Sequence, residues 1–372
     1  MSRAQEDEPP DVTHAYGRSP ILYRAVEMSA VGPAERQRWH ELRASNPALD
    51  SPYFHPEFVA AVAATRPGVK VVVGEDAAGA IESFLPIQID GRRCHPAGYP
   101  AADFQGPVCA PAARFDPVSA VQAAGAPTYV FDHLREGVPG AEPWLSGSQP
   151  SPYMDVTGGL DGYLSRAAKG GKDKASEARR LTNKAEREYG EVRLEADISD
   201  ASLLDTVIEL KRHQYTTTGA RDYFADARHI ALMHRLLDTR GDDFAGMLSA
   251  VYAGPQLVAA HFGIRAGAVL HWWFPVYAPD FSRYSPGWML LRAVISAAPD
   301  LGLERIDLGR GMDDYKRRAM TGQQTVLQGA VIPNPLRHRV ARARARAIDA
   351  VKSSPLAPTL RKAVRASRRR SA

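Results

Sequence analysis

Groups able to bind phosphate are concentrated where the sequence reads Arg283-Tyr284-Ser285-Pro286-Gly287. Ser285 is a good N-cap residue, and Pro286 suits the first position of a helix. A helix start presents unpaired backbone N–H groups and the positive end of the helix dipole, which together suit a pyrophosphate, and Gly287 would let that group approach closely. The segment is therefore interpreted as a phosphate-binding helix start, with a plain helix cap as the alternative.

Groups able to move a proton follow at a fixed distance. A predicted strand, 305–308, ends near Asp307, and a glycine-containing loop then leads to Tyr315 and Lys316. A tyrosine can act as a general acid, and a lysine can bind phosphate or carboxylate. Asp307 can orient an amine or hydrogen-bond the loop, and Tyr315 can equally pack. His213 is a further candidate, as are the histidines of the central strands, although an isolated histidine is more often a core residue.

The run 277–316 resembles the C-terminal core of the CelD-like acetyltransferases, which are FemAB-related members of the GNAT superfamily with a BioF2-like acetyltransferase domain. That family pattern is a Tyr-Ser-Pro-Gly helix start, a strand ending in Asp, then Gly and Tyr-Lys, and all of these occur here. The resemblance extends more weakly over roughly residues 22–333. The usual GNAT loop, Arg/Gln-x-x-Gly-x-Gly/Ala, is represented only by Arg283 and Gly287.

The resemblance implies an α+β fold of two GNAT-like halves with mixed, mostly antiparallel central sheets. It also implies transfer of an acyl group, most simply acetyl, from acetyl-CoA or another acyl-CoA to an amine of a sugar, an amino acid or an envelope precursor, without a metal. The alternatives are an aminoacyl-tRNA donor, as in the FemAB branch, and a degenerate scaffold that binds a partner. The candidate donor-binding residues are Arg283, Tyr284, Ser285, Gly287 and Lys316, and the candidate catalytic residues are Tyr315 and Asp307, with His213 added from its residue type alone.

The elements that must position these residues follow from hydrophobic periodicity and turn signals. Helices are predicted at 34–44, 56–65, 202–215, 225–237 and 286–298. Strands are predicted at 22–26, 69–73, 81–87, 128–131, 247–252, 257–264, 269–277 and 305–308. Two helices followed by a hairpin occur in both halves, which suggests a structural duplication. The chain is therefore divided into a disordered N-terminus at 1–20, a first GNAT-like domain at 21–157, a second with the donor site at 158–335, and a tail at 336–372.

A long basic helix is predicted within 158–189, with an interruption at Gly170-Gly171. Its lysines and arginines form either a solvated face or a surface that attracts phosphate. A second basic region begins at Arg337, from which twelve lysines and arginines stand against one acid, Asp349. This tail lacks a clean apolar stripe, so an electrostatic contact with an anionic membrane surface or with RNA is expected.

Composition limits the remaining possibilities. Hydrophobic residues make up 44% and charged residues 24% of the chain, as in ordinary globular proteins. No apolar run is long enough to cross a bilayer, and the acidic, proline-rich N-terminus is unlike a signal peptide. A cytoplasmic protein, peripheral at the inner face of the membrane, is expected. Cys94 and Cys109 form no metal-ligand or disulfide pattern and are interpreted as packing residues. Composition indicates neither the acceptor nor the oligomeric state.

Overall fold

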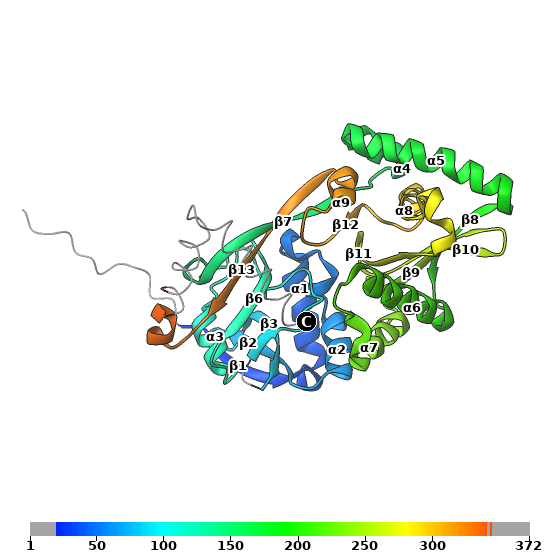
Figure 1. Cartoon of the computed structure of the whole chain (residues 1–372). Helices are drawn as coiled ribbons and strands as arrows, with labels where there is room; N and C mark the ends of the chain where they lie inside the picture. The colour runs from blue at the N-terminus through cyan, green and yellow to red at the C-terminus, as the bar shows by residue number, and fades with distance from the viewer. Residues whose placement is uncertain (1–19, 92, 341–342, 344–372) are drawn as a thin grey trace, which may run out of the picture.

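The computed structural model describes residues 20–91, 93–340 and 343. In this part of the chain, 13 strands form one continuous mixed sheet, with the order β1-β2-β3-β4-β6-β13-β7-β12-β11-β10-β9-β8 and β5 paired to β3 (Figure 1). The strands are β1 (Leu22–Glu27), β2 (Val69–Glu75), β3 (Ile81–Asp90), β4 (Arg93–Pro96), β5 (Val108–Cys109), β6 (Tyr129–Arg135), β7 (Leu145–Asp155), β8 (Val192–Ile198), β9 (Phe244–Ala253), β10 (Gln256–Ala266), β11 (Val269–Tyr277), β12 (Arg305–Asp307) and β13 (Gly322–Val331). The predicted mixed, mostly antiparallel α+β class is confirmed.

The same order of elements occurs twice along the chain. A strand, two helices and an antiparallel hairpin open each half, and a parallel strand–helix–strand unit follows: β4-α3-β6 in the first half and β11-α8-β12 in the second. The helices are α1 (Pro33–Ala44), α2 (Pro56–Thr65), α3 (Pro117–Ala123), α4 (Gly159–Arg166), α5 (Lys169–Tyr189), α6 (Ala201–Thr218), α7 (Ala227–Asp238), α8 (Pro286–Ala297) and α9 (Asp314–Ala319). This repetition is the expected signature of a duplication.

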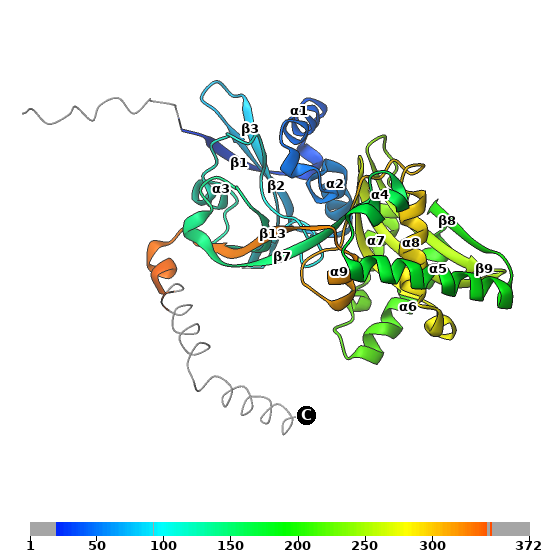
Figure 2. The ribbon, with the colours of Figure 1, turned by 90° about the horizontal axis from the view of Figure 1, so that it is seen from above.

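Two long strands connect the halves. β7 belongs by sequence to the first half but pairs with β12 of the second, and β13, which follows the second half, lies between β6 and β7. Both strands run along the middle of the molecule in Figure 2. The proposed boundary after residue 157 lies just past the end of β7, a strand whose neighbours in the sheet, β12 and β13, both come from the second half of the sequence.

Helices cover both faces of the second half of the sheet. α6 and α7 pack on one face, while α8 and α5 lie on the other, as Figure 1 shows. α7 also contacts α2, so that one hydrophobic core continues from the first half into the second. A second core lies beneath α8 and includes Leu290, Val294 and Ile295, the residues whose spacing predicted this helix. Its packing fixes the position of α8 against the sheet.

The helices and strands named from periodicity are all present, with shifts of a few residues at their ends. The predicted interruption of the basic helix is displaced. The break lies at Ala167 and Ala168, and Gly170 and Gly171 fall in the first turn of α5, where a Cβ on Gly171 would lie 2.7 Å from the carbonyl oxygen of Arg318. These glycines allow close packing against α9 instead of ending the helix.

Several elements had no sequence prediction. β7, β8 and β13 carry many small or polar residues, and their place in the sheet depends on pairing with strands that are distant in the sequence. The predicted disordered N-terminus and nearly all of the basic tail lie outside the described residues. Among the described helices, none combines the length and hydropathy needed to cross a membrane.

Candidate functional site: an open strand edge beside a helix start

The central feature of the second half is a pair of parallel strands that diverge. β11 and β12 pair only through Val269, Leu270 and His271, opposite Arg305, Ile306 and Asp307. β11 then continues for six further residues to Tyr277, and in the described part of the chain no other strand pairs with it on that side. An open strand edge offers main-chain groups that can bind an extended ligand by strand addition.

A bulge lies at the beginning of this open edge. Phe262 of β10 faces Phe274, whereas Ile264 faces His271, so that Trp272 and Trp273 together oppose Gly263. Such an insertion bends the strand and redirects its side chains and amides.

The bulge is held by a histidine on the neighbouring strand. The His261 ring stacks on Trp272 with 3.8 Å between centroids, and the Trp273 amide donates to His261 Nε2 at 3.3 Å. His261 is fully buried, and burial holds its pKa well below the ordinary value. The neutral ring therefore acts as a hydrogen-bond acceptor that supports the bulge, so we assign His261 a structural role.

A lysine that the sequence did not suggest lies at the same edge. Lys211 of α6 donates from Nζ to the carbonyl oxygen of Pro275 at 3.3 Å. Proline has no N–H and is tolerated in strands mainly at edges, which agrees with its place on β11. Burial lowers the pKa of Lys211 to about 8.

The start of α8 differs in detail from the prediction. Ser285 occupies the N-cap position with Pro286 after it, but its backbone is left-handed (φ 51°, ψ 53°) and its side chain makes no capping hydrogen bond. Capping by a side chain normally requires an extended N-cap backbone, so the predicted role of the Ser285 hydroxyl is wrong. The Ser285 carbonyl accepts from the amides of Trp288 and Met289 instead. Gly287 is exposed, and a Cβ placed there would have no neighbour within 4 Å.

The residues just before α8 anchor it to the basic helix. Tyr284 is buried, and its hydroxyl donates to Glu188 of α5. Arg283 is largely exposed, with Nη2 3.3 Å from the Glu188 carboxylate and 2.9 Å from the Tyr284 hydroxyl. Of these two predicted donor-binding residues, Arg283 is thus accessible to a ligand at the helix start, while Tyr284 stabilises the loop.

Asp307 lies at the closed end of the divergence. Its carboxylate is buried and paired with Arg305 at 2.9 Å, and Arg305 also reaches Asp50 of the first half at 2.5 and 2.7 Å. Burial raises the pKa of Asp307, and the Arg305 guanidinium opposes that shift. Because Asp307 is paired with Arg305, its carboxylate holds the end of β12 in position.

Tyr315 and Lys316 lie on α9, which follows the loop after β12. The Tyr315 side chain is 36% exposed, and partial burial raises its pKa, so the phenol stays protonated at neutral pH. Lys316 is buried at 8% exposure, and its Nζ donates to the carbonyl oxygens of Gly309 (3.2 Å) and Arg310 (2.9 Å). These bonds hold the loop between β12 and α9 in place. The predicted contact of Lys316 with a phosphate or carboxylate remains a prediction.

A carboxylate of the first half, missed at the sequence level, reaches the same end of the site. Asp103 lies 3.1 Å from Nε2 of His133 and 3.1 Å from Nε2 of His271. Burial alone would raise the pKa of Asp103, but the hydrogen bonds from both histidines hold it well below the ordinary value. His133 also contacts Asp132, at 2.8 Å, and these carboxylates raise its pKa against the effect of burial.

The hydrogen-bond pattern defines the state of His271. Because the Asp103 carboxylate accepts from Nε2 of His271, that nitrogen carries a proton, and in a neutral imidazole the other nitrogen, Nδ1, then has the lone pair. That Nδ1 is buried and has no hydrogen-bond partner among the described residues. No motif links Asp103 to His271, since they lie 168 positions apart in the sequence.

His213 lies elsewhere. It is exposed on α6 and lines a pocket of about 270 Å³ together with Val276 and Tyr277 at the far end of β11. Val276 lies five positions along β11 from His271, or roughly 17 Å at the usual rise per residue. The structure therefore brings Asp307, Tyr315 and Lys316 into one region with His271 but leaves His213 at the other end of the open edge.

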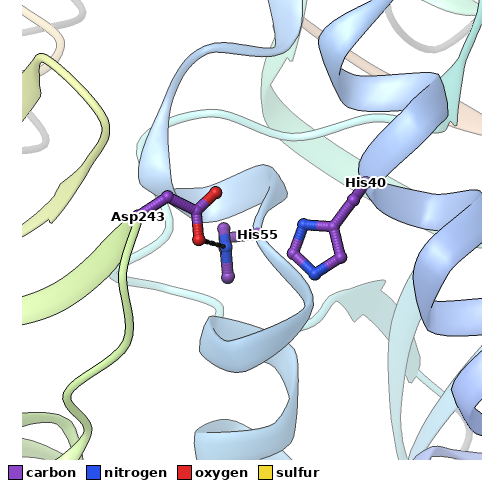
Figure 3. A group of neighbouring side chains, drawn as sticks. All are labelled: His40, His55 and Asp243. Carbon is purple, nitrogen blue, oxygen red and sulfur yellow. Dashed lines mark hydrogen bonds and ion pairs between the residues drawn. The ribbon is translucent and has the colours of Figure 1, made fainter.

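A third group of polar side chains resembles a metal site in composition: His40, His55 and Asp243, shown in Figure 3, whose ligand atoms lie within 4.8 Å of one another. However, Nδ1 of His55 accepts from the Glu57 amide at 3.1 Å. The proton must then be on Nε2, which donates to Asp243 at 3.0 Å, so neither ring nitrogen of His55 is free for a metal. The group is better explained as a contact between the halves.

Comparisons with known proteins agree with this geometry. Residues 172–317, from α5 to α9, match the family described as Acetyltransferase (GNAT) domain. No protein of curated function matches the sequence. The second half of the chain therefore carries a GNAT acetyltransferase domain, which contains the diverging strands, the start of α8 and Tyr315.

Solved structures are similar over both halves. FemX gives a TM-score of 0.58 at 11% identity, over 82% of this chain and 98% of that one. The C-terminal domain (DUF2156) of a protein described as a lysylphosphatidylglycerol synthetase from Agrobacterium fabrum gives 0.51 at 14% identity, over 86% and 98%. A conserved protein of unknown function from Bacteroides thetaiotaomicron gives 0.50 at 10% identity, over 84% and 98%. At these identities the likeness establishes the fold alone: both described halves share the fold of these structures, and the GNAT match lies within the second half.

Proposed function

We propose that the protein is an N-acyltransferase that transfers an acyl group, most simply acetyl, from acyl-CoA to an amine of a sugar, an amino acid or an envelope precursor. The observation that carries the proposal is the open edge of β11, which runs from the bulge at Trp272 to the start of α8. The pantetheine arm of coenzyme A is extended and contains two amide groups, so it can pair with a free strand edge. Its pyrophosphate would then meet the amide of Gly287 and the exposed guanidinium of Arg283.

The chemistry needs few side chains beyond those at the closed end of the site. The amine attacks the thioester carbonyl, and its proton passes to Nδ1 of His271, which Asp103 holds in the correct tautomer. The C–S bond of the tetrahedral intermediate breaks, and Tyr315 donates its proton to the departing thiolate. Holding donor and amine side by side supplies much of the rate enhancement.

A ligand-binding experiment tests the donor. The thermal unfolding midpoint would be measured with acetyl-CoA, longer acyl-CoAs and aminoacyl-tRNA, because a ligand at 100 times its Kd stabilises the folded state by about 2.7 kcal/mol. We expect acyl-CoA to raise the midpoint and an amine acceptor to release free thiol. A rise with aminoacyl-tRNA alone would assign the aminoacyl donor, and no rise with any of these donors would leave a scaffold that only binds partners.

A further inference from the structure

A large polar cleft lies between the two halves. Its volume is about 650 Å³, within the range of small-molecule sites. One wall is formed by the end of α2 and by β3 and β4 of the first half. The other is formed by the loop between α6 and α7 and the first turn of α7. A ligand in this cleft would therefore touch both halves.

A buried arginine connects the two walls. Arg66 is 6% exposed and donates from Nη1 to the Tyr99 carbonyl at 2.7 Å and from Nη2 to the Tyr223 hydroxyl at 3.2 Å. Its Nε is buried without a partner, and no carboxylate in the described part of the chain lies within 4.0 Å of the guanidinium. A buried cation without a counter-ion is unfavourable, and an anionic ligand in the cleft would supply one.

The remaining charges also leave the cleft positive. Two of its carboxylates are already paired, Asp222 with Arg212 at 3.0 Å and Asp226 with Arg228 at 2.6 Å. Arg93 and Arg221 are exposed, and their side chains have no hydrogen bond or ion pair to any described residue. Three arginines of the cleft, Arg66, Arg93 and Arg221, therefore outnumber the one remaining carboxylate, that of Asp90.

Each wall also presents a flat stacked pair of rings. His95 stacks on Tyr99 with 4.4 Å between centroids and 9° between planes, and His229 stacks on Tyr223 at 3.9 Å and 10°. His95 Nδ1 is buried and lacks a partner. Planar rings next to arginines form a surface for a ring that carries a charged group.

The cleft also approaches the proposed reaction centre. Tyr223 packs against Phe274 of β11 with 5.5 Å between ring centroids, and Phe274 follows the bulge directly. A compound whose anionic part lies on Arg66 could therefore extend its other end toward the open edge.

We infer that the cleft binds the acceptor, and that the acceptor is an amine that carries a phosphate or diphosphate group, such as a phosphorylated amino sugar. This inference rests on the proposed acyl transfer and names its substrate class. The arginines would bind the phosphate oxygens, and the ring pairs would contact the sugar.

Titration calorimetry on the full chain tests the cleft directly. Inorganic pyrophosphate and glucosamine 6-phosphate would be titrated in the presence of saturating coenzyme A, which occupies the donor site. We expect both to bind, with Arg93→Gln/Arg221→Gln weakening affinity about tenfold or more, the scale of one lost charge-assisted hydrogen bond. Arg235→Gln, an exposed arginine of α7 outside the cleft, should bind as the wild type does.

The outcomes separate the two proposals. The cleft proposal would be overturned if the double variant bound these phosphates as tightly as the wild type. It would also be overturned if the wild type bound coenzyme A but neither phosphate. Both results would leave the acyltransferase proposal standing. If the protein bound phosphate through Arg93 and Arg221 but bound no acyl-CoA, the cleft proposal would be supported and acyl-CoA would be overturned as the donor. Glucosamine acetylated as fast as glucosamine 6-phosphate at equal low concentrations would contradict the phosphate requirement.

Discussion

His271 and Asp307 face each other at the last paired position of β11 and β12, where the two strands begin to diverge. Each is tied to the first half by a different carboxylate: His271 contacts Asp103 directly, and Asp307 reaches Asp50 through Arg305. The first half therefore positions the closed end of the site, although the acetyltransferase match covers only residues of the second half.

Gly287→Asp should abolish acyl-CoA binding while the protein remains folded. A carboxylate at the helix start would repel the donor pyrophosphate, and the position is open, since a Cβ would meet nothing within 4 Å. Calorimetry with acetyl-CoA and the thermal midpoint measure the two effects. Gly287→Ala is the matched control and should keep most of the affinity. Unchanged affinity in a folded Gly287→Asp protein would contradict the assignment of this helix start.

Tyr315→Phe should lower kcat by roughly 10²-fold, the scale of general acid catalysis, with little change in acetyl-CoA affinity. The Tyr315 phenol is protonated at neutral pH, as a general acid requires, and burial raises its pKa, which makes it a weaker acid than a free tyrosine. Tyr252→Phe, on the distant strand β9, serves as the control. If the Tyr315→Phe variant turned over substrate at the wild-type rate, Tyr315 would be a packing residue and not the general acid.

His271→Gln should lower kcat by roughly 10²-fold or more, because the variant lacks the Nδ1 lone pair that accepts the amine proton. Acetyl-CoA affinity should change little, and the rate should recover in part at a pH high enough to deprotonate the acceptor amine without help. Single-turnover rates across pH measure this recovery. A variant impaired equally at every pH would indicate that His271 only supports the fold.

The Asp103–His133–Asp132 cluster should make stability depend on pH. The pKa of His133 is raised, so its contribution is complete below the unfolded pKa of about 6.5 and is lost as pH rises through the folded pKa. The pKa values of Asp103 and Asp132 are lowered, so their contribution is present above about 3.9 and lost as pH falls further. Urea unfolding at pH 5.5, 7.0 and 8.5 should show the wild type losing its advantage over His133→Gln as pH rises. A constant difference would refute the linkage.

A protein ending at Pro335 should keep acyl transfer to a small acceptor but lose binding to anionic vesicles at low salt. β13 ends at Val331, so this truncation leaves the described sheet complete and removes the contact between His338 and Trp144. Each basic residue near an anionic surface contributes about 1 kcal/mol. Vesicle co-sedimentation at two salt concentrations measures the effect. If the truncated protein bound vesicles as well as the full chain, the tail would be excluded as the membrane-binding segment. If the full chain bound RNA but not vesicles, RNA would be identified as the partner of the tail.

The sequence by itself determined the local elements of the second half. Proline after a serine, followed by apolar residues at helical spacing, was sufficient to predict α8. Apolar runs bounded by turn residues were sufficient for β9 to β11, because these signals act within one turn or one strand. The same local signals led to Gly287 and Tyr315. They misjudged Ser285, because its left-handed backbone depends on how the preceding loop packs against α5 through Tyr284 and Glu188.

Only the tertiary structure determined which of these residues meet. The divergence of β11 and β12 depends on a register between strands separated by a helix, and the Asp103–His271 contact joins two halves of the chain. His213 and Asp307 were both candidate catalytic residues, but His213 lies at the opposite end of β11 from Asp307. Residue type and spacing along the sequence carry no information about such distances, because long-range pairing is fixed by the sum of many weak packing and hydrogen-bond contributions across the sheet.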